Sequence, residues 1–176
     1  MRTVTLPFRK AVYQALQGIT YNDVLINVFE EEIQETPNKK VSLLTIGGAQ
    51  IKVWIILTNQ TSNDNSSKQC RNDETGLQVQ VKAEFPSNKG NSVIPESIMD
   101  LIVNRLFNYT GLFKGIEMDY PFSLWKLDYI GDRNLNYSGD SSRVWMKNLD
   151  ILGHVNQVPS ALNNNGFDYS FDFALS

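Results

Sequence analysis

The sequence has few of the residues that build disulfides and metal sites. Cys70 is the only cysteine among 176 residues, which excludes an intrachain disulfide and a multi-cysteine zinc site and fits a reducing compartment. His154 is the only histidine, and it has no cysteine or carboxylate partner at a metal-ligand spacing. We therefore expect a structural or exposed role for His154 and no metal site.

An excess of basic residues and long apolar runs are also lacking. Lys and Arg total 16 against 19 Asp and Glu, a formal net charge of −3, which argues against a protein that holds nucleic acid by neutralising phosphates. The longest apolar run, residues 53–57, is too short to span a membrane, and the first seven residues lack the apolar run of a signal peptide. We expect a weakly acidic, soluble protein made inside the cell, with no specific nucleic acid recognition and no membrane attachment.

No group of residues indicates a reaction. Cys70 lies beside Lys68 and Arg71, which could lower its pKa, but a nucleophile also needs a positioned base and none is near in the sequence. The acidic residues 30–32 follow one another on a predicted strand, so their side chains cannot converge on a cation. The sequence predicts no catalytic residue, no cofactor and no enzyme activity.

The sequence is rich in strand patterns, and the clearest lies between residues 51 and 85. Residues 51–58 are rich in β-branched and aromatic types on both faces, which indicates a strand covered on both sides. In residues 77–85 apolar and polar types alternate, which predicts one buried and one wet face. The polar residues 59–76 between them have too little apolar surface to offset the entropy of ordering. We predict an antiparallel hairpin with a long mobile loop at 59–76 that is dispensable for folding but needed for docking.

The two faces of strand 51–58 cannot both point at one helix. Trp54 and Ile56 lie on one face, opposite Val53, Ile55 and Leu57. One alternative is that a helix predicted at 8–18 covers the Trp54 face. The other is that Trp54 and Ile56 contact a neighbouring subunit, because buried aromatic residues often anchor interfaces.

Helical spacing of apolar residues occurs twice. It predicts a helix at 8–18, which Pro7 opens and Gly18 ends. It also predicts a helix at 95–108, whose wide apolar stripe is typical of a helix lying across a sheet. Further strands are predicted at 23–32, at 122–130 and at 143–155. A shift of the apolar phase between Leu124 and Trp125 indicates a β-bulge, and residues 132–142 are expected to connect two strands.

These elements predict a single α+β domain at 1–157, with a mainly antiparallel sheet packed by the N-terminal helix and the second helix. Residues 158–176 form an extension, the C-terminal arm, in which an Asn-rich link precedes an aromatic–acid alternation. Its aromatic residues are Phe167, Tyr169, Phe171 and Phe173. Because exposed aromatic residues on a tail promote aggregation, we expect them to be covered, either by the arm's own sheet or by strand addition to the sheet edge of a neighbouring subunit.

The order of predicted elements is helix, strand, strand, long loop, strand, helix, strand, strand. With the opening helix 8–16, the hairpin 51–85, the helix 98–106 and the closing strand 143–155, the chain resembles the tail-terminator and tail-completion proteins of tailed bacteriophages over residues 6–157. Two features depart from that pattern, the long hairpin loop and the C-terminal arm. Both fit a variant that forms a neck or connector ring.

The resemblance implies a structural virion protein that forms a ring at the head–tail junction, as a neck or connector protein or as a tail terminator. It implies as partners other copies of the chain and portal, connector or tail-tube proteins. The protein would reside in the virion tail or neck after synthesis in the host bacterial cytoplasm. The alternative is a small intracellular ligand- or protein-binding α+β module, for which a pocket with convergent polar residues is expected.

Overall fold

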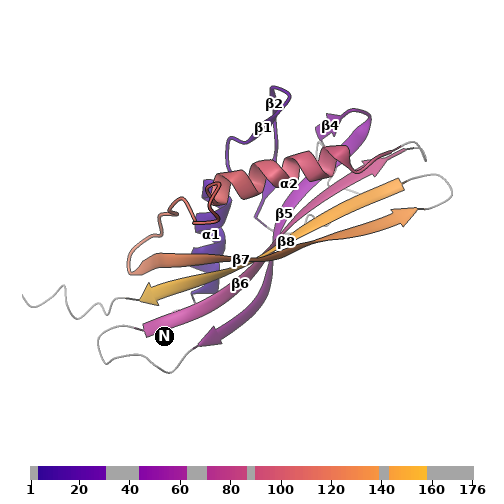
Figure 1. Ribbon diagram of the computed structural model, residues 1–176. Coiled ribbons are helices and arrows are strands. Elements are labelled where there is room, and N and C mark those ends of the chain that lie inside the picture. The colour runs from indigo at the N-terminus through magenta and orange to yellow at the C-terminus, as the bar shows by residue number, and fades with distance from the viewer. Residues whose placement is uncertain (1–3, 31–43, 63–70, 87–89, 139–142, 158–176) are drawn as a thin grey trace, which may run out of the picture.

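The computed structural model of the protein describes residues 4–30, 44–62, 71–86, 90–138 and 143–157. Over these residues the chain is an α+β fold with two α-helices and a mostly antiparallel six-stranded sheet, which confirms the predicted fold class (Figure 1). The long strands of the sheet are strongly twisted, as the right-handed twist of L-amino-acid strands requires.

The helices are α1 (Thr5–Ala15) and α2 (Val93–Leu106). The main sheet contains β3 (Val28–Phe29), β4 (Leu44–Ile46), β5 (Ala49–Ser62), β6 (Arg71–Phe85), β7 (Phe122–Ser138) and β8 (Arg143–Gln157). Two further strands, β1 (Thr20–Tyr21) and β2 (Val24–Leu25), form a separate hairpin. The main sheet has the order β3-β5-β6-β8-β7, and β4 also pairs with β5. The pair β3–β5 is parallel and the other pairs are antiparallel.

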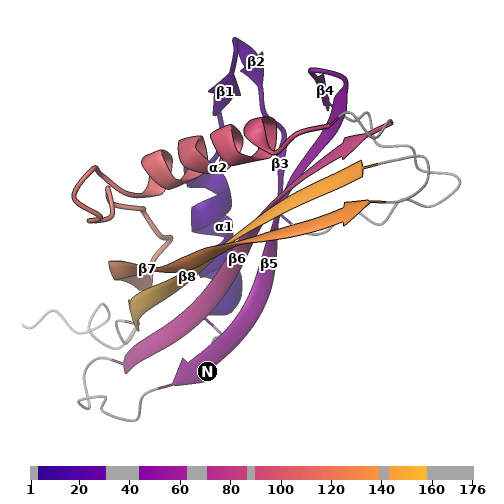
Figure 2. The ribbon, with the colours of Figure 1, turned by 45° about the vertical axis from the view of Figure 1, so that its right-hand side comes forward.

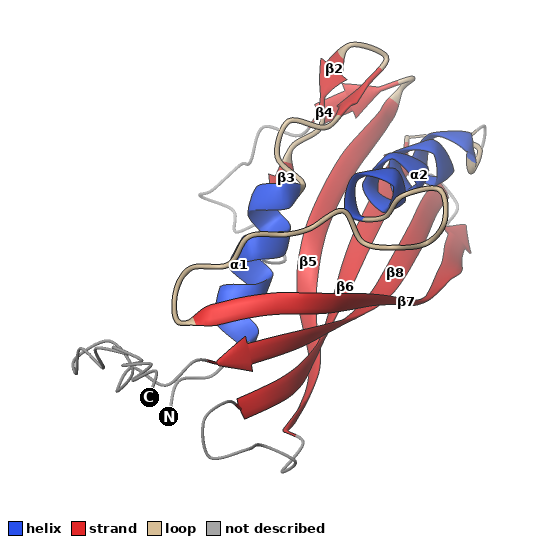
Figure 3. Cartoon of the chain, turned by 60° about the vertical axis from the view of Figure 1, so that its left-hand side comes forward, coloured by secondary structure: helices blue, strands red, loops and turns tan. Residues whose placement is uncertain are grey.

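Both helices pack on the same side of the sheet (Figure 3). Their axes point in clearly different directions (Figure 2), and they cover different pairs of strands that share β6. Helix α1 contacts β5 and β6, and α2 contacts β6 and β8. The core lies between the helices and the sheet, where Phe8 of α1 and Ile98 and Ile102 of α2 are fully buried.

The alternation in residues 77–85 is confirmed by burial in the structure. Leu77, Val79, Val81 and Ala83 are fully buried on the side that faces the helices. Every second residue therefore contributes to the core, as the period of a pleated strand requires. The two predicted helices are also present, each beginning two or three residues earlier than the sequence pattern indicates.

The predicted loop at 59–76 is shorter than expected. Strand β5 continues to Ser62 and β6 begins at Arg71, and the two still pair from Gln60 with Thr75 to Ser62 with Asp73. The polar start of β6 is held on its other side by β8, in a ladder that reaches Gln157. Backbone pairing on both sides stabilises a strand whose side chains gave no strand pattern.

The single strand predicted at 23–32 is divided in its described part, residues 23–30, into the two short strands β2 and β3. Asn22 and Asp23 have φ values of 48° and 63°, and they form the tight turn between β1 and β2. Asn and Asp tolerate this left-handed backbone conformation better than other residues with a side chain. The later residues Val28 and Phe29 form the short strand β3, which pairs with β5.

The predicted bulge next to Trp125 is confirmed, because the pairing of β7 with β8 skips one residue between Leu124 and Lys126. A second bulge lies at Ile130, where the pairing skips from Tyr129 to Gly131. The connection predicted at 132–142 is wrong over 132–138, since β7 continues to Ser138. The C-terminal arm lies outside the described residues, so the division of the chain at residue 157 stays a prediction.

Candidate functional site

One face of the sheet carries no helix from the described part of the chain, and we call it the outer face. Direct cross-strand partners lie on the same face, so the register assigns the outer residues of the central strands. They are Gln50, Lys52, Trp54 and Ile56 of β5, Gln78, Gln80, Lys82 and Glu84 of β6, and Val144, Met146, Asn148, Asp150, Leu152 and His154 of β8. This face mixes amides, charges and apolar side chains, and a face of that kind is suited to contact another macromolecule.

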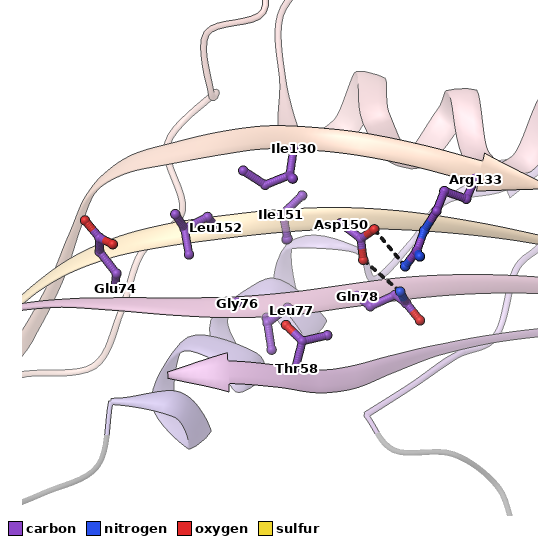
Figure 4. Close-up of a pocket in the computed structure, with 10 residues that line it drawn as sticks. All are labelled: Thr58, Glu74, Gly76, Leu77, Gln78, Ile130, Arg133, Asp150, Ile151 and Leu152. Carbon is purple, nitrogen blue, oxygen red and sulfur yellow. Dashed lines mark hydrogen bonds and ion pairs between the residues drawn. The ribbon is translucent and has the colours of Figure 1, made fainter. Parts of the chain in front are cut away.

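Amide and charged side chains form cross-strand bonds over the middle of the outer face. Gln80 Nε2 donates to Asn148 Oδ1 at 2.7 Å, and both residues are buried. Beside them, Gln78 Nε2 donates to Asp150 Oδ1 at 2.7 Å, and Arg133 Nη2 lies 3.1 Å from Asp150 Oδ2. Both oxygens of Asp150 are therefore engaged within the protein (Figure 4).

Gln78, Asp150 and Arg133 line a depression of about 650 Å³ on the outer face (Figure 4). Ile130 and Leu152 contribute apolar side chains to its lining, and Glu74 and Thr58 contribute polar ones. Because the charge of Asp150 is already paired with Arg133, the most central charged groups of the depression stabilise each other.

His154 lies at one end of the outer face, between two carboxylates. Its Nε2 atom is 2.7 Å from Asp128 Oδ2, and its Nδ1 atom is 3.5 Å from Glu74 Oε1. Lys126 also donates to Asp128, at 2.9 Å. Burial raises the pKa of Asp128, but the hydrogen bonds from Lys126 and His154 outweigh this and leave the pKa below its usual value. The cluster thus links β6, β7 and β8, the structural role expected for His154.

A second polar cluster lies on the helix side of β7, which the sequence pattern did not reveal. Lys147 Nζ is 2.7 Å from Asp132 Oδ2, and the Tyr129 hydroxyl donates to Asp132 Oδ1 at 2.5 Å. The hydrogen bond from Lys147 has the largest effect on the pKa of Asp132, and together with the bond from Tyr129 it lowers that pKa. The same bond to Asp132 raises the pKa of Tyr129 to about 12. The ring of Tyr129 also packs edge-on against Phe107, just after α2.

Strand β7 exposes apolar side chains on the outer face. The exposed fractions are 51% for Trp125, 61% for Ile130 and 38% for Leu135. The Trp125 ring lies 5.3 Å from His154, Ile130 lines the depression, and Leu135 is the partner of Met146. We call Trp125, Ile130 and Leu135 the edge row. Trp125 and Ile130 are the two bulged residues, and the sequence marked only the first of them.

The structure settles which face of β5 points to the helices. Val53 and Ile55 face them and are buried, whereas Trp54 and Ile56 lie on the outer face. Trp54 is nevertheless only 5% exposed, and Ile56 is half-buried. Phe167, Tyr169, Phe171 and Phe173 lie outside the described residues. The interface roles of all six residues remain predictions.

Within the described ranges, no group of three or more His, Cys, Asp or Glu side chains is placed to hold a metal ion. A search of the same ranges for a helix that is long and apolar enough to cross a membrane found none.

The fold belongs to the class in which two helices cover one side of a mostly antiparallel sheet. No protein-family model and no curated protein matches the sequence. Among solved structures, the chain is similar to a chain of the structure described as the virion of a native gene transfer agent particle. The two share 12% sequence identity with a TM-score of 0.51, over 84% of this chain and 93% of that one. At this identity the likeness shows a shared fold.

Proposed function

We propose that this protein is a structural virion component that forms a ring at the head–tail junction of a tailed bacteriophage, as a neck or connector protein or as a tail terminator. The observation that carries the proposal is the likeness to a chain of a virion. It extends over 93% of that chain, so it concerns a whole fold and not one motif. The order of elements in the sequence, which resembles that of tail-terminator and tail-completion proteins, supports the proposal independently.

The surface supports assembly through unlike faces. A ring forms when one face of a subunit meets a different face of the next. This subunit has a helix-covered side and an outer face with amides, paired charges and the edge row. Its partners in the proposal are copies of itself and portal, connector or tail-tube proteins, and its role is one of geometry without turnover.

Trp54 and Ile56 belong to the proposed interface on the outer face. Because Trp54 is 5% exposed, Trp54→Ala is expected to weaken the fold as well as assembly. Ile56 is half-buried, so Ile56→Ala separates the two effects better. Assembly should decrease more than the thermal stability of the monomer does.

The alternative is a ligand-binding module, and the depression on the outer face is the observation in its favour. Its volume of about 650 Å³ lies within the range of about 300–1,000 Å³ for ligand sites. However, Asp150 and Arg133, which would orient a ligand, are paired with each other. We therefore prefer the ring.

The mass of the purified protein in solution tests the proposal. The monomer has a mass of 20.0 kDa. We expect light scattering to show a discrete, several-fold larger oligomer, alone or after addition of virion proteins, and electron microscopy to show closed rings. A strict monomer that binds a metabolite in the depression would support the module instead. Arg133→Gln provides a matched variant, because it alters the depression without truncating the edge row.

A further inference from the structure

Strand β7 is the edge of the main sheet. In the described residues it pairs only with β8. Phe122 N–H donates to the Asp119 carbonyl, and beyond it the other side of β7 presents backbone N–H and C=O groups without a strand partner up to Ser138. Such an edge is a template for pairing with another chain, and proteins blunt it with bulges or charges. The two bulges in β7 do not prevent such pairing, because the edge row places three exposed apolar side chains along the strand.

We propose that β7 accepts the C-terminal arm of a second copy of this chain, which adds a strand to its free edge. This inference rests on the proposal that copies of the protein assemble. Residues 167–173 would form the added strand, about 23 Å long at a rise of about 3.3 Å per residue. β7 itself has 17 residues, so it is long enough to pair with the whole added strand.

The side chains of the arm match the edge row. In an extended strand Phe167, Tyr169, Phe171 and Phe173 lie on one face, opposite Asp168, Ser170 and Asp172. With the aromatic face on the outer side, the rings would cover Trp125, Ile130 and Leu135. The acidic face would then meet water at the rim of the sheet. Two sets of exposed apolar groups, one on each copy, would shield each other.

The topology favours a second copy over the arm's own sheet. β8 ends at Gln157, which pairs with Phe122, the first residue of β7. An arm that leaves Gln157 has β7 between itself and the free edge, and residues 107–121 enter β7 at the same end. Within one chain the arm would have to pass these residues. It would then run parallel to β7, which is slightly less stable per residue, unless the link first extended about 23 Å along the edge so that the arm could return. A second copy can supply the arm in the antiparallel direction.

The link is long enough to reach a neighbour. Residues 158–166 span up to about 30 Å when extended, and their Asn-rich composition is typical of a flexible tether. Strand addition then supplies backbone hydrogen bonds for affinity and side-chain contacts for specificity.

Cross-linking between two single-cysteine variants tests the inference on the full-length chain. Both carry Cys70→Ser, which removes the only native thiol. One also carries Ser170→Cys in the arm, and the other Asn134→Cys, an exposed position on the helix side of β7. Mixed in equal amounts, tagged to differ in mass and treated with a short bismaleimide, they should yield a covalent heterodimer.

The control replaces Asn134→Cys by Val93→Cys, at the exposed start of α2. Cross-linking no stronger than in this control overturns the inference. A doubly substituted chain that links only within itself also overturns it, because the arm would then pair with its own β7.

A second variant measures the edge row itself. Ile130→Lys places a charge at the centre of the row, and Val93→Lys is the matched control on a residue of similar exposure. Because burial of an isoleucine is worth about one factor of ten or more in affinity, Ile130→Lys should weaken self-association at least about tenfold and Val93→Lys should not. Equal effects of the two would contradict the proposal.

The outcomes separate this inference from the proposed ring. Rings that form without arm cross-links would support the proposed ring and contradict the exchange of arms. Dimers or open chains that are linked through the arm but form no rings would support the exchange of arms and contradict the proposed ring. A strict monomer at every concentration, and also after addition of virion proteins, contradicts both proposals.

Discussion

At the scale of single residues, Gly153 sets how closely α1 approaches the sheet. A Cβ atom at this position would lie 2.5 Å from Cζ of Phe8, which is fully buried in α1. We expect Gly153→Ala to lower the free energy of unfolding by about 1–3 kcal/mol through overpacking. Urea unfolding should show a lower midpoint with an unchanged slope.

Phe8→Leu is the matched partner for this substitution, because it removes the ring that the new methyl group would meet. The double variant Gly153→Ala/Phe8→Leu should lose less stability than the sum of the two single variants, as contacting residues are not additive. If the losses simply add, the contact between Phe8 and Gly153 does not limit the approach of α1.

Asp132 should make stability depend on acidic pH. Lys147 and Tyr129 lower its pKa in the folded state, so its contribution is present above its unfolded pKa, near 4. That contribution is lost as the pH falls through the lower folded value. Between pH 5 and pH 2.5 the native protein should therefore lose more stability than Asp132→Asn, in urea titrations at each pH.

At the scale of elements, the β5–β6 hairpin extends its pairing further into the polar segment than its side chains indicate. Residues 73–75 pair with both β5 and β8. The side chains of Asp73 and Thr75 are buried. The part of the chain that can be shortened without loss of this ladder is therefore 63–70 and not the wider 61–74.

We expect a short Gly/Ser turn in place of 63–70 to leave the melting temperature nearly unchanged, because the entropy of loop closure depends only weakly on loop length. The same replacement of 61–74 should lower it clearly, since it removes the paired start of β6. Thermal melts of the two variants check this. The docking role of the loop requires that the shorter replacement also reduce incorporation into particles; normal incorporation would remove that role.

At the scale of the whole molecule, both helices pack on one face of the sheet, and the hydrophobic core of the described residues lies on that side. The described residues from Val4 to Gln157 build this core. Deletion of 159–176 should therefore leave a chain with a cooperative melt close to that of the full protein, while its oligomers decrease in light scattering. If the truncated chain loses its cooperative melt, the arm belongs to its own core and the exchange between copies fails.

The sequence by itself determined the elements whose signals are local. The alternation of β6, the apolar stripe of α2 and the phase shift at Trp125 each arise within a few residues, because burial of one face dictates residue type at a fixed period. These signals were sufficient for the α+β class and for the order of the long elements. They also identified Trp54 and Ile56 as a pair on one face of β5.

Only the tertiary structure decided the features that depend on partners far away in the chain. The polar ends of β5, β6 and β7 are strands because β8 and its neighbours supply their hydrogen bonds. The side that carries both helices follows from packing between distant elements, and with it the outer position of half-buried Ile56 and of exposed Ile130. His154 meets Asp128 and Glu74 only through the sheet register. No local period encodes such pairings, because backbone groups are alike at every residue and the register is set by the core.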